Sequence, residues 1–131
     1  MPTDQELISA AWIAREKAYA PYSKFKVGAA LLGADGEIVL GCNVENLSYG
    51  LTNCAERVAI GAAVARGVTR FDAVAVVADT GVPISPCGAC RQVLAEFGVG
   101  RIILANRTES LEFTLEELLP RMSAGILDKA E

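Results

Sequence analysis

Histidine is absent from this sequence of 131 residues, and its absence restricts the chemistry that the chain can perform. It excludes serine–histidine–aspartate triads, cysteine–histidine nucleophile pairs, haem bound through histidine and every zinc site with an imidazole ligand. Proton transfer near neutral pH must therefore rely on a carboxylate, a thiol, a lysine or a tyrosine, with a pKa shifted for the task.

Positive charge is also scarce, with 12 lysines and arginines against 16 aspartates and glutamates, for a net charge of −4. Proteins that bind phosphate backbones need a basic face, so this balance argues against a nucleic-acid partner. No apolar run approaches the roughly 20 residues of a membrane-spanning helix. Residues 1–6 are acidic and lack the basic and apolar regions of a signal peptide. We therefore expect a cytoplasmic protein with no membrane partner.

One domain over residues 1–131 is expected, because the chain has the length of a typical domain and 52% of its residues are hydrophobic. The sequence has four cysteines, namely Cys42, Cys54, Cys87 and Cys90. In a reducing cytoplasm thiols stay free, and a domain with a large apolar core has little need of cross-links. Metal binding or redox chemistry is therefore favoured over disulfides.

Hydrophobic periodicity and turn residues predict alternating helices and strands. A capping box at 3–6 predicts the start of a first helix, which ends at 20–21. A second capping box at 114–117 predicts the start of a last helix, which ends at Pro120. Further helices are predicted over 54–66 and 88–97, and strands over 26–32, 37–42, 71–78 and 101–105. The order α-β-β-α-β-α-β-α predicts an α/β fold whose mixed sheet has helices on its faces.

Three of the cysteines lie where two of the predicted helices begin. Cys87 and Cys90 are three residues apart and share one helical face. Residues two apart in a helix point about 200° away from each other, so Cys54 and Glu56 face one site only if Cys54 is the non-helical cap. Three thiolates would bind one Zn²⁺ and leave a fourth position for water, as in catalytic zinc sites.

A zinc ion together with three thiolate ligands has a net negative charge, which weakens the ability of the metal to acidify a bound water molecule. Two helix N-termini supply partial positive charge near the sulfur atoms. We interpret Arg57 as a hydrogen-bond donor to a thiolate that restores part of this acidity, with Gln92 holding Arg57 in place.

Two alternatives to a catalytic zinc site exist. A C-x-x-C pair alone fits a dithiol redox protein as well as a zinc site, and the presence of Glu56 two residues after Cys54 favours zinc. A structural zinc site would use Cys42 as a fourth ligand. Because Cys42 ends a predicted strand, we expect it to pack as a small apolar side chain instead.

Three motifs follow one another between residues 20 and 90, within a resemblance to a known family that extends from about Glu6 to Pro120. They are APYSKFKVGAAL at 20–31, GCNVEN at 41–46, and CAER at 54–57 combined with PCGAC at 86–90. In this order they resemble the short, homotetrameric cytidine deaminases that hold zinc by three cysteines. The resemblance implies a three-layer α-β-α sandwich with a mixed five-stranded sheet, and one zinc ion per subunit on Cys54, Cys87 and Cys90.

The resemblance implies hydrolytic deamination of free cytidine and 2′-deoxycytidine to uridine and 2′-deoxyuridine plus ammonia, a reaction of pyrimidine salvage. Zinc-bound hydroxide attacks C4 of the base, and Glu56 carries protons from water to N3 and to the leaving amine. An alternative is another aminopyrimidine nucleoside, such as a nucleoside antibiotic.

The resemblance also assigns substrate contacts. It implies that the backbone N–H of Ala55 holds the base carbonyl, that the Ser85 carbonyl meets the 4-amino group and that Phe25 packs against the nucleoside. Asn43 and Glu45 match residues that bind the ribose 3′-hydroxyl, which favours a plain ribose. A carboxylate at that hydroxyl would repel a 3′-phosphate, so nucleic acid is disfavoured again.

In the family, neighbouring subunits complete each site. Tyr49 matches a tyrosine that the neighbour supplies, and many members add a phenylalanine near the C-terminus. Here the segment after Pro120 has no aromatic residue. We expect Met122 or Ile126 to replace that ring with a softer contact.

Overall fold

The computed structural model describes residues 1–122. These residues form one mixed sheet of five strands, in the order β2-β1-β3-β4-β5. The strands are β1 (Val27–Gly33), β2 (Ile38–Cys42), β3 (Phe71–Ala78), β4 (Arg101–Ala105) and β5 (Ser110–Thr114). The helices are α1 (Asp4–Arg15), α2 (Ala55–Ala65), α3 (Gly88–Glu96) and α4 (Leu115–Leu118), with a short 3-10 turn at Tyr49–Leu51. Strands β3 and β4 are parallel, and the other neighbouring pairs are antiparallel.

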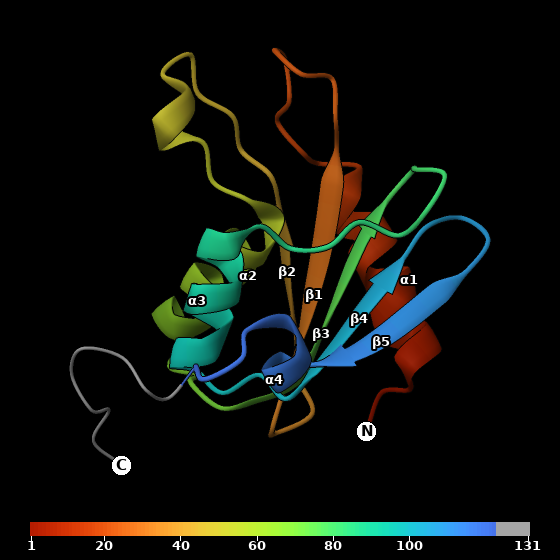
Figure 1. Cartoon of the computed structure of the whole chain (residues 1–131), viewed down its shortest axis with the longest axis vertical. Coiled ribbons are helices and arrows are strands. Elements are labelled where there is room, and N and C mark those ends of the chain that lie inside the picture. Colours follow the sequence, from red (N-terminus) through yellow and green to blue (C-terminus); the bar gives the residue numbers. More distant parts are fainter. Residues whose placement is uncertain (123–131) are drawn as a thin grey trace.

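Helices cover both faces of this sheet, as Figure 1 shows, with α1 behind it and α2, α3 and α4 in front. A large apolar cluster lies between the sheet and α2 and α3, and a smaller one lies beneath α1. This arrangement confirms the three-layer sandwich that the resemblance implies. Within residues 1–122, no helix has the length and apolar character that crossing a membrane requires.

Helix α1 confirms its predicted start but not its predicted end. The capping box of Thr3 and Glu6 forms, with each side chain bonded to the backbone of the other residue. The helix stops at Arg15 instead of continuing to residue 20. The reason is a long-range pairing, because the Tyr19 N–H donates to the Asn43 carbonyl and the Tyr19 carbonyl accepts from Glu45 N–H.

Strand β5 is the element that the residue pattern misses. The pattern yields four strands, whereas the structure adds β5 at the outer edge of the sheet, paired with β4. The polar and apolar residues of Ser110–Thr114 alternate as in a strand, but the run is short and most of its residues are exposed, so the signal is weak.

Two glycines bring helices directly onto the sheet. A Cβ at Gly28 would lie 2.0 Å from the Ala11 carbonyl oxygen of α1. A Cβ at Gly41 would lie 2.4 Å from the Ala55 carbonyl oxygen and 2.5 Å from the Ala59 nitrogen of α2. The absence of these side chains sets how deeply both helices sit, and at Gly41 it sets the position of the first turn of α2.

Candidate active site

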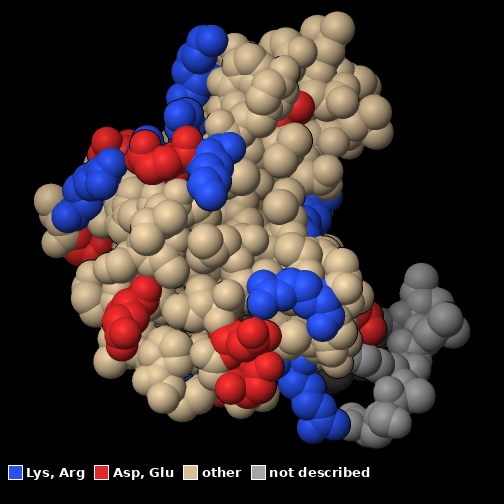
Figure 2. Space-filling model, turned by 180° about the vertical axis from the view of Figure 1, so that it is seen from behind, with Lys and Arg blue, Asp and Glu red and all other residues tan. Residues whose placement is uncertain are grey.

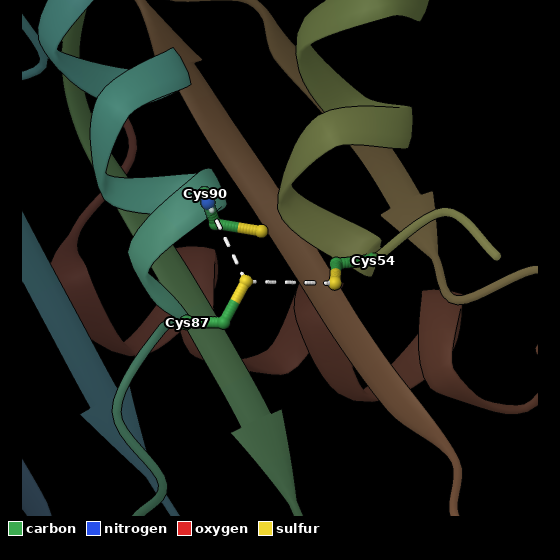
Figure 3. Close-up of side chains that lie close together, drawn as sticks. All are labelled: Cys54, Cys87 and Cys90. Atoms are coloured by element: carbon green, nitrogen blue, oxygen red, sulfur yellow. Dashed lines mark hydrogen bonds between the residues drawn. The ribbon is translucent and has the colours of Figure 1, made fainter. Parts of the chain in front are cut away.

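Three cysteines converge where α2 and α3 begin. Cys54 is the N-cap of α2, Cys87 is the N-cap of α3, and Cys90 lies in the first turn of α3. Their Sγ atoms all lie within 4.8 Å of one another, and those of Cys54 and Cys87 are 3.9 Å apart. Figure 3 shows the three side chains directed into the space between the two helix starts. The cap position predicted for Cys54 is confirmed.

The spacing of the sulfur atoms fits a zinc ion. With Zn–S bonds of about 2.3 Å, tetrahedral coordination places sulfur ligands about 3.8 Å apart. The separation of 3.9 Å between the Sγ atoms of Cys54 and Cys87 agrees with this value. In the described part of the chain, the cysteine cluster does not include Cys42, so a four-cysteine site is not formed. Three ligands leave one tetrahedral position for water.

The pKa values of the cysteine thiols favour a bound cation at this site. Hydrogen bonding with Cys90 and then with Arg57 lowers the pKa of the Cys54 thiol to about 5. The pKa of Cys90 is raised, because its thiol is hydrogen-bonded to Cys54 and is buried. The cluster therefore accepts one negative charge readily and resists a second. A divalent cation removes that resistance, since it stabilises all three thiolates.

Arg57 stands beside the cluster as predicted. Its Nη2 atom donates to the Cys54 Sγ at 3.4 Å, and this contact raises the pKa of the guanidinium. Among the described residues, the buried Nε atom of Arg57 has no hydrogen-bond partner. Gln92 is exposed on α3, so its role as the residue that holds Arg57 stays a prediction.

Glu56 occupies the first turn of α2 and is only 5% exposed. Burial raises the pKa of its carboxyl to about 7, and the nearby Cys54 thiolate acts in the same direction. A carboxylate with a raised pKa is a stronger base than an exposed one and is able to exchange protons near neutral pH.

A cavity of about 220 Å³ lies against this cluster. It is lined by Phe25, Val27, Asn43, Thr52, Cys54, Ala55, Glu56, Ile84, Ser85 and Cys87. Seven of these are residues that the sequence analysis singles out, drawn from four separate segments. Val27, Thr52 and Ile84 were not singled out. Each of them is an ordinary apolar or hydroxyl residue next to a motif residue, and nothing in its type signals a site.

Glu45 and Tyr49 do not line that cavity. They line an adjoining one of about 360 Å³ together with Tyr22, Ser23, Asn46 and Thr52. Thr52 borders both cavities and connects the two sets of residues. Tyr49 is 76% exposed, and its ring lies 6.4 Å from that of Tyr22.

Asn43 is buried, and its side chain is hydrogen-bonded to the backbone just before and at the start of β1. Its Nδ2 donates to the Phe25 carbonyl at 2.7 Å, and its Oδ1 accepts from Val27 N–H at 2.9 Å. Met122 packs against the apolar core of its own chain, while Ile126 lies outside the described residues.

Comparisons with known proteins agree with this geometry. Residues 1–106 match the family model of the cytidine and deoxycytidylate deaminase zinc-binding region. Cytidine deaminases of Sporosarcina psychrophila and Halalkalibacterium halodurans are 56% and 54% identical over 119 residues, covering 88% of this chain and 88% and 90% of theirs. The crystal structure of cytidine deaminase from Burkholderia pseudomallei superposes with a TM-score of 0.88 at 53% identity, covering 92% of this chain and 98% of that one. With its three-thiol cluster at the helix starts, this chain belongs to the cytidine and deoxycytidylate deaminase family.

Proposed function

We propose that this chain catalyses the hydrolytic deamination of free cytidine and 2′-deoxycytidine to uridine and 2′-deoxyuridine, with release of ammonia. The observation that carries the proposal is the buried carboxylate of Glu56, which shares one cavity with the thiols of Cys54 and Cys87. The similar proteins and the similar crystal structure that cover nearly the whole chain are cytidine deaminases.

Cys54, Cys87 and Cys90 would hold the zinc ion. When bound, zinc supplies Lewis acidity that makes a water molecule nucleophilic near neutral pH. Arg57 donates to the Cys54 sulfur and so withdraws negative charge from a site with three anionic ligands. Without this donor, we expect the site to be a weaker Lewis acid.

Glu56 moves the protons. Deamination replaces the 4-amino group with oxygen from water, and the two protons of that water end on N3 and on the departing ammonia. Glu56 takes one proton as the oxygen attacks C4 and passes it to N3. It then transfers the second proton to the amine while the C4–N bond breaks. Its burial excludes bulk water that would compete for these protons.

Backbone groups around the cavity position the base. The N–H of Ala55 belongs to the first turn of α2, where amides lack an intrahelical acceptor, and it is free to donate to the base carbonyl. The Ser85 carbonyl accepts from the 4-amino group, and the Phe25 ring packs against the nucleoside. These contacts orient C4 toward the metal cluster.

Asn43 and Glu45 bind the ribose 3′-hydroxyl, at the junction between the two cavities near Thr52. Glu45 makes this end of the site anionic. A free hydroxyl is accepted there and a 3′-phosphate is repelled, which matches the net charge of −4 in favouring nucleosides over nucleic acid.

The chain assembles as a homotetramer in which neighbours complete each site. Support comes from the segment 43–53, where Leu47, Tyr49 and Leu51 are 76%, 76% and 66% exposed. Figure 2 shows that the projecting part of the molecule that holds this segment carries almost no charge on the side in view. Clustered apolar exposure of this kind is typical of a protein–protein interface. Light scattering of the active enzyme tests the assembly, and a fully active monomer would refute it.

One assay tests the reaction. The zinc-loaded protein is incubated with cytidine, and we expect loss of cytidine absorbance with equimolar ammonia. A protein that leaves cytidine unchanged but deaminates an aminopyrimidine antibiotic would establish the alternative substrate. A protein without stoichiometric zinc, whose thiols oxidise reversibly in pairs, would be a redox module instead.

A further inference from the structure

The loop between α1 and β1 forms one wall of the candidate site without regular structure to support it. Residues 21–25 are all exposed and form neither helix nor strand, although Phe25 lines the cavity. Lys24 has φ 61°, in the left-handed region that a residue with a Cβ seldom adopts. Specific bonds must therefore hold this loop in shape.

Glu45 supplies three of these bonds from a distant part of the chain. Its Oε1 accepts from the N–H of Tyr22 at 3.0 Å and from the N–H of Ser23 at 3.1 Å. Its Oε2 accepts a hydrogen bond from the Ser23 hydroxyl. Because these bonds stabilise the charged form, the pKa of Glu45 is lowered, with Ser23 as the main cause.

The Ser23 hydroxyl has a second partner. While it donates its proton to Glu45, its oxygen accepts from Phe25 N–H at 3.0 Å. A hydroxyl is able to do both, because it carries one proton and two lone pairs. Ser23 thereby connects a carboxylate of one cavity to the backbone of a residue that lines the other.

The carboxylate of Glu45 keeps one free position. An ionised carboxylate has about four acceptor sites, and the three bonds from Tyr22 and Ser23 leave one of them, on Oε2. The Ser23 hydroxyl occupies the other acceptor site of Oε2, and together with the two backbone amides it orients the carboxylate and thereby the remaining lone pair. A ribose hydroxyl bound by Glu45 must approach along it.

We propose that Ser23 is a positioning residue for nucleoside selectivity, which orients Glu45 toward the ribose 3′-hydroxyl and fixes Phe25 beside it. The proposal rests on the proposed function, since it assumes that Glu45 meets this hydroxyl. Ser23 is hydrogen-bonded to Glu45 and Phe25 and lines a cavity that neither the cysteines nor Glu56 line, so we expect it to act on substrate binding and not on the chemical step.

The experiment compares cytidine with 3′-deoxycytidine in the wild type and in Ser23→Ala. We expect the substitution to raise KM for cytidine about tenfold, the factor that corresponds to one hydrogen bond to a charged group. KM for 3′-deoxycytidine should change less than about threefold, and kcat should stay within about twofold. The Kd of uridine, measured by calorimetry, should rise in parallel with KM for cytidine.

Three variants complete the design. Ser23→Thr keeps the hydroxyl and should restore selectivity, and Glu45→Ala should abolish it so that adding Ser23→Ala causes no further loss. Ser9→Ala is the matched control, because Ser9 is also exposed and lies on α1, on the face of the sheet opposite the metal cluster. It should bind both nucleosides like the wild type. Ser23 is exposed and outside the core, and zinc content with circular dichroism verifies that each variant folds.

The possible outcomes distinguish a failure of the proposed role of Ser23 from a failure of the proposed function. A Ser23→Ala enzyme with wild-type KM for cytidine, or with an equal loss on both substrates, overturns the role of Ser23 in selectivity. A wild-type protein that does not deaminate cytidine overturns the proposed function itself, whatever Ser23 does.

Discussion

Helices α1 and α2 lie on opposite faces of the sheet and approach it in the same way, at Gly28 and Gly41, yet they begin differently. The N-terminus of α1 is closed by a capping box. The N-terminus of α2 begins at Cys54, whose side chain makes no cap bond. Capping side chains stabilise a helix but occupy the amides of its first turn. Helix α2 lacks that stabilisation and keeps its first turn available to a ligand.

The glutamates of the two first turns show the same contrast. Glu6 is exposed, and hydrogen bonds from Thr3 lower its pKa. Glu56 is buried, and burial raises its pKa to about 7. One residue type in nearly the same helical position thus has a lowered pKa where it is solvated and bonded, and a raised pKa where it is desolvated beside a cavity.

The largest effect is expected when one of the cysteine thiols at the starts of α2 and α3 is removed. Cys87→Ala should lose stoichiometric zinc and reduce deamination to background, because two thiolates hold the ion poorly. Stability should fall as well, since the metal ties the starts of α2 and α3 together. Metal analysis and thermal unfolding measure both effects. Cys42→Ala, which removes a thiol outside the cluster, should keep its zinc, and zinc retained by Cys87→Ala would show that the ligand set is wrong.

Next in size is the effect expected from removing the carboxylate of Glu56, the proposed proton carrier. Glu56→Gln should keep zinc and fold while kcat falls by more than about 10⁴-fold, because one carboxylate serves several proton transfers. Glu6→Gln is the matched substitution on α1, where glutamine still completes the capping box, and its kcat should stay within about twofold. Steady-state kinetics on zinc-loaded protein compares them. Substantial activity in Glu56→Gln would remove this residue from the mechanism.

The contrast between the helices also explains what the sequence could predict. The caps, the C-x-x-C pair and the position of Cys54 are local features, and the structure agrees with each of them. The end of α1 depends on pairing with a distant segment at Asn43, which leaves no local signal. Strand β5 pairs with β4, the strand just before it in the chain, and its short and mostly exposed alternation is only a weak signal.

The same limit applies within the candidate site. The family motif assigns Glu45 and Asn43 to the substrate, and the motif alone does not reveal that both also hold the loop before β1. Those bonds exist because segments about 20 residues apart meet in space. Thr52, which borders both cavities, likewise becomes visible only once the chain is folded.

A smaller effect is expected from substitutions at Gly28 and Gly41, the two glycines that let α1 and α2 lie close to the sheet, and it should differ between them. Gly28→Ala and Gly41→Ala each force a methyl group into helix backbone, so both should destabilise by about 3 kcal/mol. Only Gly41→Ala should also lower kcat and weaken zinc binding in the folded protein, because it displaces the turn that carries Cys54 and Glu56.

Chemical denaturation gives the stabilities of these variants, and kinetics at 15 °C compares their folded forms. Gly61→Ala adds a methyl group to an exposed position of α2 where nothing lies within 4 Å, so it should stabilise the protein by about 1 kcal/mol and leave kcat within about twofold. Equal losses of kcat in the variants at Gly28 and Gly41 would mean that the position of α2 has no special role.

The smallest effect concerns the cap of α1. Thr3→Ala removes the side chain that accepts from Glu6 N–H, and it should destabilise by about 1 kcal/mol and lower Tm by about 4 °C. Zinc content, KM and kcat at 25 °C should be unchanged, because the sheet separates α1 from the metal cluster. Calorimetry and kinetics on one preparation test both statements. A loss of kcat beyond about twofold would show that the order of α1 is transmitted through Gly28 and β1 to the site, and the division between a structural and a chemical helix would then fail.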